Sequence, residues 1–144
     1  MNGFLLTWNP VIGDTPDNWS DDDLVKGLVR PFKSKGFVVT NWRTASPRMM
    51  EPGDVVFLLQ QGRKPAAIFG AGITLEKPRR KPNEARRFAV KVKITKLSNP
   101  AKGEFLISGP ACRDLLGRLV ATRFSGRRIP DEALKRLLKM AGGI

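Results

Sequence analysis

The fold is decided by residues 51–74, EPGDVVFLLQQGRKPAAIFGAGIT. The opening EPGD is typical of a type II turn, because proline sets the first central torsion and glycine accepts a positive φ. An apolar run at 55–60 follows as a strand, and a short loop leads to a second strand at 66–75. Gly70 and Gly72 in that second strand suit a bend or bulge. This stretch therefore predicts a hairpin within a strongly curved sheet.

Further strands and helices surround this hairpin in the sequence. Alternating or continuous apolar runs predict strands at 3–8, 37–40, 88–95 and 104–107. Capping signals followed by apolar residues at helical spacing predict helices after Ser20, Ser108 and Pro130. About six strands interleaved with a few helices predict an α+β chain, in which a mixed sheet curls into a barrel. The length suits a single domain over residues 1–144.

The charge of the chain points to an anionic partner. Lys and Arg number 26 against 13 Asp and Glu, so the formal net charge is +13. Nucleic acid is the leading interpretation, and a merely solvated basic surface is the alternative. A membrane surface would also attract this charge, but no apolar stretch approaches spanning length and no signal peptide is evident. We expect a cytoplasmic protein.

The composition excludes most familiar catalytic machinery. The chain has no histidine, and Cys112 is its only cysteine. Histidine-based triads, zinc clusters and internal disulfides are therefore excluded, and we expect no metal or cofactor. The remaining enzymatic alternative is a metal-dependent nuclease with Asp54, Glu76 or Glu51 as ligands. Since no phosphate loop or paired acidic motif accompanies them, we expect a binding domain rather than an enzyme.

Three segments resemble the EVE domains of the PUA-like superfamily. They are FLLTWNP at 4–10, TNWRTAS at 40–46 and EPGDVVFLLQQGRKPAAIFGAGIT at 51–74, so the resemblance covers about the first two-thirds of the chain. FLLTWNP looks like the opening of EVE-like domains that precede HNH nuclease domains in modification-dependent restriction enzymes. No HNH motif is present, since that motif requires histidine. The sequence departs from many members by having TWNP in place of a more polar segment similar to KSEP.

The resemblance implies a PUA-like fold and a pocket for a modified base at the open end of the barrel. The end of the first strand, the Trp42 segment and the strand after the Gly-Asp turn would form that pocket. Trp42 would be one wall. By similarity to the related YTH domains, which hold a methylated base between aromatic rings, Trp8 or Trp19 would be the second. Core packing is the alternative for each indole.

A base reader also needs polar groups along the edge of the base. Asn9 and Gln60 each carry a donor and an acceptor, and Thr7, Thr44 and Ser46 carry hydroxyls. We expect Asn9 to read the edge. The alternatives are a turn role for Asn9, an exposed strand end for Gln60, and backbone capping for the hydroxyl residues.

Basic residues along the chain are candidates for phosphate contacts, which supply affinity without sequence information. Some of them lie in the basic turn at 76–82, which is too proline-rich for regular structure. They are Arg43, Arg63, Lys64, Arg79, Arg80, Lys81, Arg86, Arg87, Arg123, Arg127 and Arg128.

The sequence thus predicts a reader of DNA that carries a modified base, such as 5-methylcytosine, 5-hydroxymethylcytosine or N6-methyladenine. Base flipping into an aromatic pocket and a place in a modification-dependent restriction system follow from the resemblance. A C-terminal nuclease domain in a longer protein is consistent with the Gly142-Gly143 ending, which is typical of a linker. An RNA-binding module of the PUA or YTH kind is the second interpretation, and the 2′-hydroxyl discriminates between them.

Overall fold

The computed structural model describes residues 1–11, 19–44, 49–80, 88–122 and 124–144. The strands are β1 (Gly3–Trp8), β2 (Val38–Thr44), β3 (Val55–Gln60), β4 (Ala67–Thr74), β5 (Arg79–Arg80), β6 (Phe88–Leu97) and β7 (Arg127–Ile129). The helical segments are α1 (Asp21–Leu24), the π-helical turn η1 (Val25–Val29), α2 (Arg30–Lys35), η2 (Pro100–Lys102), α3 (Gly109–Leu116), η3 (Gly117–Ala121) and α4 (Asp131–Ala141). The α+β class predicted from sequence is confirmed.

The predicted hairpin forms as β3 and β4, which pair antiparallel. Gly53 has a φ of 90°, and the Asp54 amide donates to the Glu51 carbonyl at 3.1 Å, as the type II turn requires. Register shifts lie opposite Gly70 and beside Gly72. At Gly72 the β6 backbone passes so close that a Cβ would overlap the Lys93 carbonyl.

The seven strands form one mixed sheet in the order β2-β6-β4-β3-β1-β7, and β5 pairs with β6. β1 runs parallel to β3, whereas the other pairings are antiparallel. The sheet is open, so the predicted barrel closure is wrong. Within the described residues no ladder joins the edge strands β2 and β7. The reason is that β7 is only three residues long and pairs with Gly3–Leu5, the first half of β1.

Beyond Leu5, where β7 stops pairing with β1, side chains supply hydrogen-bond partners for the β1 backbone. The Thr7 amide donates to the Ser125 hydroxyl at 3.1 Å, and the Thr7 carbonyl accepts from the Trp42 indole at 3.0 Å. The Thr44 hydroxyl donates to the Ser125 carbonyl at 3.4 Å. The Thr7 amide and carbonyl at the edge of β1 therefore have hydrogen-bond partners although no further strand pairs with them. β2 lies close to this edge.

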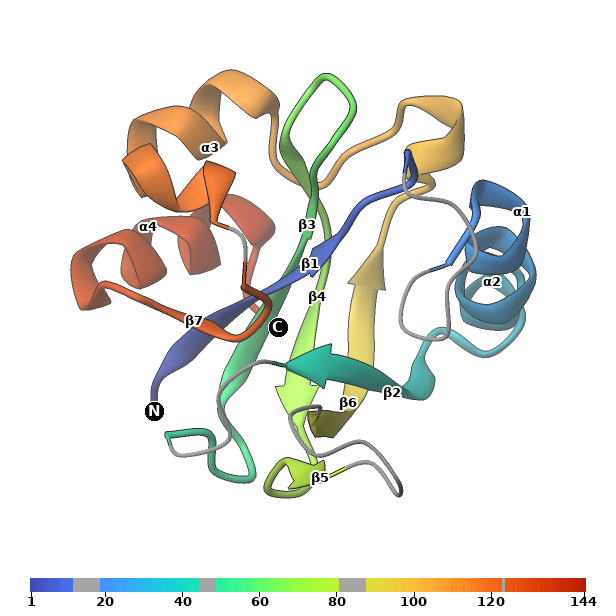
Figure 1. Ribbon diagram of the computed structural model, residues 1–144, viewed down its shortest axis with the longest axis horizontal. Helices are drawn as coiled ribbons and strands as arrows, with labels where there is room; N and C mark the ends of the chain where they lie inside the picture. Colours follow the sequence, from blue (N-terminus) through green and yellow to red (C-terminus); the bar gives the residue numbers. More distant parts are fainter. Residues whose placement is uncertain (12–18, 45–48, 81–87, 123) are drawn as a thin grey trace.

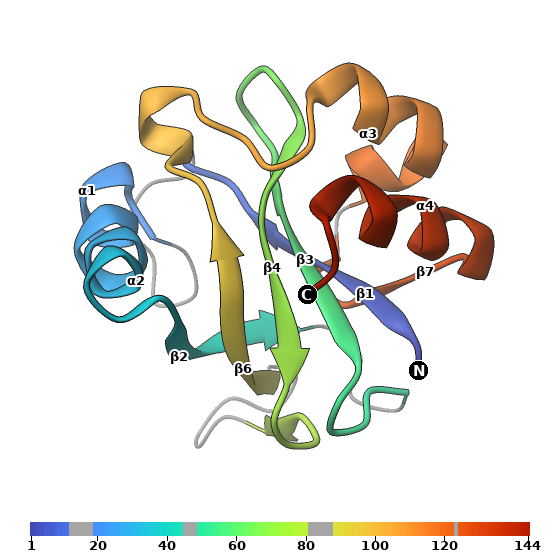
Figure 2. The ribbon, with the colours of Figure 1, turned by 180° about the vertical axis from the view of Figure 1, so that it is seen from behind.

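Two apolar cores lie on the two faces of the sheet. Leu6, Trp8 and Trp42 pack with Leu28 of η1 in one core, whereas Leu5 of β1 packs with residues of α3 and α4 in the other. Figures 1 and 2 show α1 and α2 beside the β6 end of the sheet and α3 and α4 beside the β1 end. Because both faces are covered, every residue of β1 and β3 is buried.

The first helix begins as predicted, with the Ser20 hydroxyl accepting from the Asp23 amide at 3.2 Å. It widens into the π-helical turn η1 just before Pro31, whose ring would clash with the carbonyl four residues earlier in a regular α-helix. Gly36 ends it in the left-handed conformation, with a φ of 81°. No helix in the described residues is long and apolar enough to cross a membrane.

Two local predictions are corrected. The segment 104–107 contributes only one isolated bridge, between Ile107 and Ile68, because it leaves the sheet toward α3. The basic turn after Glu76 was expected to lack regular structure, yet Arg79 and Arg80 pair with β6 as the short strand β5.

Candidate nucleic-acid interface

Two parallel strands end side by side and bring polar residues together. Trp8 at the end of β1 lies opposite Gln60 at the end of β3, and the Gln61 amide donates to the Trp8 carbonyl at 2.8 Å. Gly62 follows with a φ of 77°, and the Asn9 side chain occupies the space where a Cβ of Gly62 would lie. Asn9 and Gln61 therefore leave the sheet at the same place.

A cavity of about 450 Å³ opens at this place. It is lined by Asn9, Arg43, Gln61, Gly62, Ala66, Val120, Ala121 and Thr122, and we call it the Arg43 cavity. Its volume falls in the range of small-molecule sites, roughly 300–1,000 Å³. The lining combines small apolar side chains with three amide or guanidinium groups, so its chemistry suits a flat polar ring.

The amide side chains of the cavity are held in fixed orientations. Gln61 Nε2 donates to the carbonyls of Val120 at 3.0 Å and Thr122 at 2.7 Å. Asn9 Oδ1 accepts from the Val11 amide at 3.0 Å. The bonds of Gln61 also tie the end of η3 to the end of β3, so the two sides of the cavity form one unit.

Arg43 is the electrostatic centre of this cavity. Its Nε is buried, with no hydrogen-bond partner in the described part of the chain, and burial lowers the pKa of its guanidinium. The group nevertheless stays protonated, because arginine does not lose its proton in proteins. A desolvated cation with an unpaired donor costs free energy, which a ligand with acceptor atoms would offset.

The three indoles predicted as pocket walls form a cluster behind the cavity. Trp42 is 7% exposed and Trp8 1% exposed, and Trp8 Nε1 donates to the Trp19 carbonyl at 2.6 Å. The ring centroids of Trp19 and Trp42 are 5.7 Å apart and their planes are inclined by 43°. A base between two rings needs about 7 Å, twice the usual contact distance of about 3.5 Å. In this arrangement no base fits between them, and their role as walls stays a prediction.

The polar residues predicted for the pocket do not all lie at the same site in the structure. Asn9 lines the Arg43 cavity. Thr7, Thr44 and Gln60 are buried. The Thr44 hydroxyl and Gln60 Nε2 donate to carbonyls of the chain, Gln60 to that of Pro65 at 2.9 Å, whereas Thr7 is bonded through its backbone amide and carbonyl. Ser46 lies outside the described residues.

Arg63, predicted to contact phosphate, is engaged within the fold. Its guanidinium binds the Asp21 carboxylate with two bonds of 2.8 and 2.9 Å and donates to Gln60 Oε1 at 3.0 Å. It also lies over the Trp8 ring, 5.6 Å from the centroid. Its phosphate contact stays a prediction, and such a contact would compete with Asp21.

The other basic candidates lie on several elements. Arg79 pairs with Glu76 at 3.2 Å, and Arg80 stacks on Phe88 at 5.7 Å. Lys64 is exposed beside Arg63. Arg127 and Arg128 lie on β7. Lys81, Arg86, Arg87 and Arg123 fall outside the described residues.

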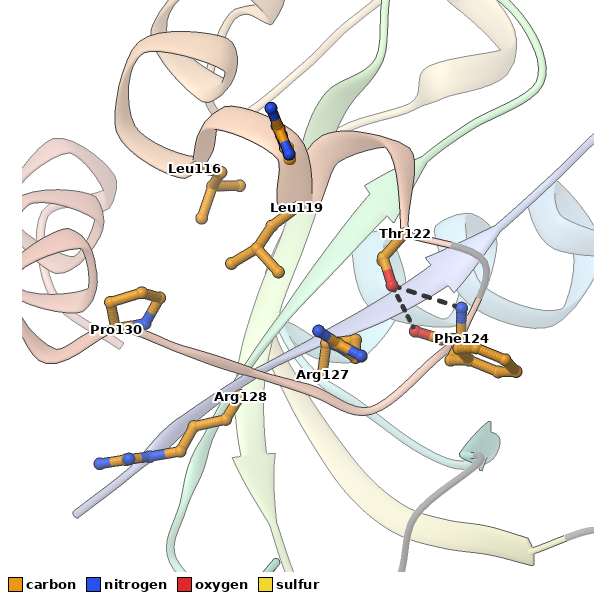
Figure 3. A pocket seen from close by; sticks show the side chains of 8 residues that line it. Leu116, Leu119, Thr122, Phe124, Arg127, Arg128 and Pro130 are labelled. Carbon is orange, nitrogen blue, oxygen red and sulfur yellow. Dashed lines mark hydrogen bonds between the residues drawn. The ribbon is translucent and has the colours of Figure 1, made fainter.

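A second cavity of about 570 Å³ borders the first. It is lined by Leu116, Arg118, Leu119, Thr122, Phe124, Arg127, Arg128 and Pro130, and we call it the Phe124 cavity. Figure 3 shows Leu119 pointing into the space between η3 and β7, with Phe124 and Pro130 at opposite ends. Thr122 lines both cavities, so they are neighbours.

Neither a known family nor a curated protein matches the sequence, whereas solved structures match the fold. The crystal structure of human THYN1 in complex with 5-methylcytosine-containing DNA has 12% identity and a TM-score of 0.57, over 100% of this chain and 99% of that one. An NMR structure from Rhodopseudomonas palustris has 19% identity and a TM-score of 0.54, over 99% and 94%. A Leishmania major protein has 14% identity and a TM-score of 0.59, over 99% and 95%. The chain shares their fold.

This likeness confirms the predicted PUA-like fold, apart from barrel closure. It extends over nearly the whole chain, beyond the first two-thirds in which the sequence motifs lie. At these identities it concerns the fold alone, and the site must be argued from the residues of this chain.

Sequence reasoning missed Gln61, Thr122 and Phe124. Gln61 directly follows Gln60, which was predicted for the pocket. Gln61 lies beside Asn9 because β1 pairs with β3 in parallel, and no local sequence pattern indicates that pairing. Thr122 comes from the last third of the chain, far from the motifs. Phe124 could have been found from the sequence, because it is an aromatic residue within the basic run RFSGRR, a pattern typical of nucleic-acid binding. No group of three or more Cys, Asp or Glu in the described residues is placed to hold a metal ion.

Proposed function

We propose that this protein binds DNA and receives a modified base in the Arg43 cavity. The observation that carries the proposal is the partly buried Arg43 guanidinium, whose buried Nε has no partner in the described chain, in a cavity of base-compatible size. An unpaired buried donor is rare in proteins and points to a ligand or a water in the functional state.

The donors of Arg43 match the acceptor atoms of a cytosine. The Watson-Crick edge of cytosine carries adjacent acceptors at N3 and O2, and a guanidinium presents parallel donors that can bind such a pair. The small apolar groups of Ala66, Val120 and Ala121 leave room at the wall of the cavity. A 5-methyl or 5-hydroxymethyl group is neutral, so the cavity would select it by shape and desolvation. We therefore favour 5-methylcytosine, with N6-methyladenine as the competing purine.

The basic surface supplies affinity that does not depend on the base. A formal charge of +13 attracts the phosphate backbone, and the binding it gives should weaken steeply with salt. Recognition within the cavity should persist at high salt, because it relies on desolvated hydrogen bonds and shape. These two parts of the binding free energy can therefore be measured separately.

The likeness to a protein solved with 5-methylcytosine-containing DNA supports the proposal through the fold. Together with the EVE resemblance of the sequence, it favours a modified base over plain DNA and DNA over RNA. An RNA-binding role is the second candidate. It would be shown by tighter binding to the matched RNA strand, in which the 2′-hydroxyl is the only systematic difference beyond uracil.

We infer that the chain binds DNA without cleaving it, as the recognition module of a modification-dependent restriction system. The resemblance of FLLTWNP supports this role, and any nuclease activity would lie in a domain outside this sequence. Incubation of methylated duplexes with the protein and Mg²⁺ should leave the DNA intact. Cleavage by the purified chain, lost in Asp54→Asn, would instead support the nuclease alternative.

The test compares matched oligonucleotides by fluorescence anisotropy at low and high salt. The set holds unmodified DNA, the same DNA with 5-methylcytosine, 5-hydroxymethylcytosine or N6-methyladenine, and the RNA counterpart. The wild type should prefer one modified DNA at both salt concentrations, and Arg43→Met should remove that preference. Arg136→Met, at an exposed position of α4, is the control for loss of one charge. Equal, salt-sensitive binding of all oligonucleotides by the wild type would refute the proposal.

A further inference from the structure

Phe124 is an aromatic side chain that the fold leaves uncovered. It is 57% exposed, more than any other aromatic residue in the described chain, and it lies next to the Arg43 cavity through the shared residue Thr122. A single exposed phenylalanine is common on protein surfaces, so the interpretation of Phe124 depends on its place beside the cavity and on its neighbours.

Thr122, Ser125 and Gly126, close to Phe124 in the chain, make hydrogen bonds to other parts of the protein. Before the ring, the Thr122 carbonyl accepts from Gln61 Nε2 at 2.7 Å, and the Thr122 hydroxyl contacts the Phe124 backbone at 3.4 Å, as Figure 3 shows. After the ring, the Ser125 hydroxyl accepts from the Thr7 amide, and the Gly126 amide donates to the Leu5 carbonyl at 2.7 Å. The ring is therefore presented to solvent from a braced backbone.

Arginine residues line the same cavity as this ring. Arg118 and Arg127 line the Phe124 cavity with it, and among the described residues neither has a carboxylate within ion-pair distance. Arg128 is partly neutralised by Asp131 at 3.2 Å. An aromatic face among unpaired guanidinium groups is complementary to nucleic acid, which offers bases to stack and phosphates to bind.

We propose that Phe124 is a wedge that enters the DNA duplex at the position vacated by the base bound in the Arg43 cavity. This inference rests on the proposed function. Removing a base from the stack costs a few kcal/mol, and an apolar side chain inserted between base steps offsets part of that cost. The anchored neighbours of Phe124 suit this role, because ordering less of the backbone on insertion costs less conformational entropy.

The wedge predicts a difference between double-stranded and single-stranded substrates. A single strand has no vacated position, so the ring contributes only to the duplex complex. Phe124→Ala should weaken binding to a duplex with one modified base about tenfold to a hundredfold, the equivalent of stacking one base. Binding to the same modified strand without its complement should change less than twofold.

The control is Phe37→Ala, which removes another exposed phenylalanine that lies under Lys93 and away from both cavities. It should leave both affinities unchanged. A second variant, Phe124→Trp, places an indole at the same position, and its fluorescence should be quenched by the modified duplex more than by the single strand. Circular dichroism establishes that each variant is folded.

The outcomes separate the wedge from the base site. An equal loss on both substrates in Phe124→Ala, or no loss on either, would overturn the wedge while the wild-type preference for the modified base stands. A wild type without that preference on either substrate would refute the base site and the wedge together. A selective loss on the duplex, with the preference retained on the single strand, supports both.

Discussion

The tryptophan cluster and the Arg43 cavity lie at the same end of the sheet, yet their polar atoms are in opposite states. The Trp8 and Trp42 indoles are buried, and their N–H groups donate to carbonyls of the chain itself. Arg43 is only partly buried as a residue, but its buried Nε has no partner among the described residues. A satisfied buried group stabilises the fold, whereas an unsatisfied one reduces stability and calls for a functional explanation. This difference is consistent with a structural role for the first region and supports the proposed binding role of the second.

The largest expected effect is that of Trp42→Ala on stability. Removing a buried indole and its bond to Thr7 should lower the free energy of unfolding by about 3–5 kcal/mol in urea titration. Trp42→Phe keeps most of the packing and is the informative variant for binding. If Trp42→Phe remains folded and loses the preference for modified DNA, the cluster is part of the site and the comparison fails.

Arg63→Met tests whether the arginine that packs on the tryptophan cluster stabilises the fold rather than binding DNA. This arginine binds Asp21 with two bonds and stacks on Trp8, but the pair is partly exposed and screened by solvent. We expect a loss of about 2 kcal/mol in unfolding free energy and no change in the ratio of modified to unmodified DNA binding. Arg136→Met, whose ion pair with Asp114 is long and exposed, should cost less than about 0.5 kcal/mol. A changed ratio in Arg63→Met would place Arg63 in the site.

Arg43→Lys sharpens the comparison of the two regions, because it keeps the positive charge but removes the parallel N–H donors of the guanidinium. A lysine cannot bind two adjacent acceptors in the plane of a base. Affinity for the preferred modified DNA should fall about tenfold, while binding to unmodified DNA stays within twofold because the net charge is the same. Equal losses on the two DNAs would show that Arg43 contacts phosphate rather than the base.

Gly62→Ala has the smallest expected effect and tests the rim of the cavity. A Cβ there would overlap the Asn9 side chain, and alanine is disfavoured at a φ of 77°. We expect a loss of about 1 kcal/mol in stability, with weaker discrimination because Asn9 must move. Gly53→Ala also has a positive φ, but a Cβ there meets no atom within 4 Å, so it controls for backbone strain. Unchanged discrimination in Gly62→Ala would remove Asn9 from the base edge.

The sequence was sufficient for the elements whose signals are local. The turn at Gly53, the cap at Ser20 and the apolar runs of β1 and β3 each carry their own physical cause within a few residues. Closure of the barrel was predicted wrongly, because whether two edge strands meet depends on β7, a three-residue strand with no apolar pattern of its own.

The site was predicted less completely, for a related reason. Asn9 was predicted to read the base edge and Arg43 to contact phosphate, because the chemistry of each is visible in the sequence. Whether an indole faces a pocket or the core depends on what packs against it, and Trp42 is covered by Trp19 from a distant segment. Gln61 and Thr122 line the cavity because of tertiary contacts between them, which no sequence motif predicts.

The parallel pairing of β1 with β3 has a consequence for the time at which the protein becomes active. Asn9 leaves the ribosome well before Thr122, which completes the cavity wall. Contacts this distant in sequence are slow to form and cannot exist in the nascent chain until Thr122 has been made. The proposed affinity for a modified base should therefore appear only after the segment that holds Thr122 has joined the end of β3.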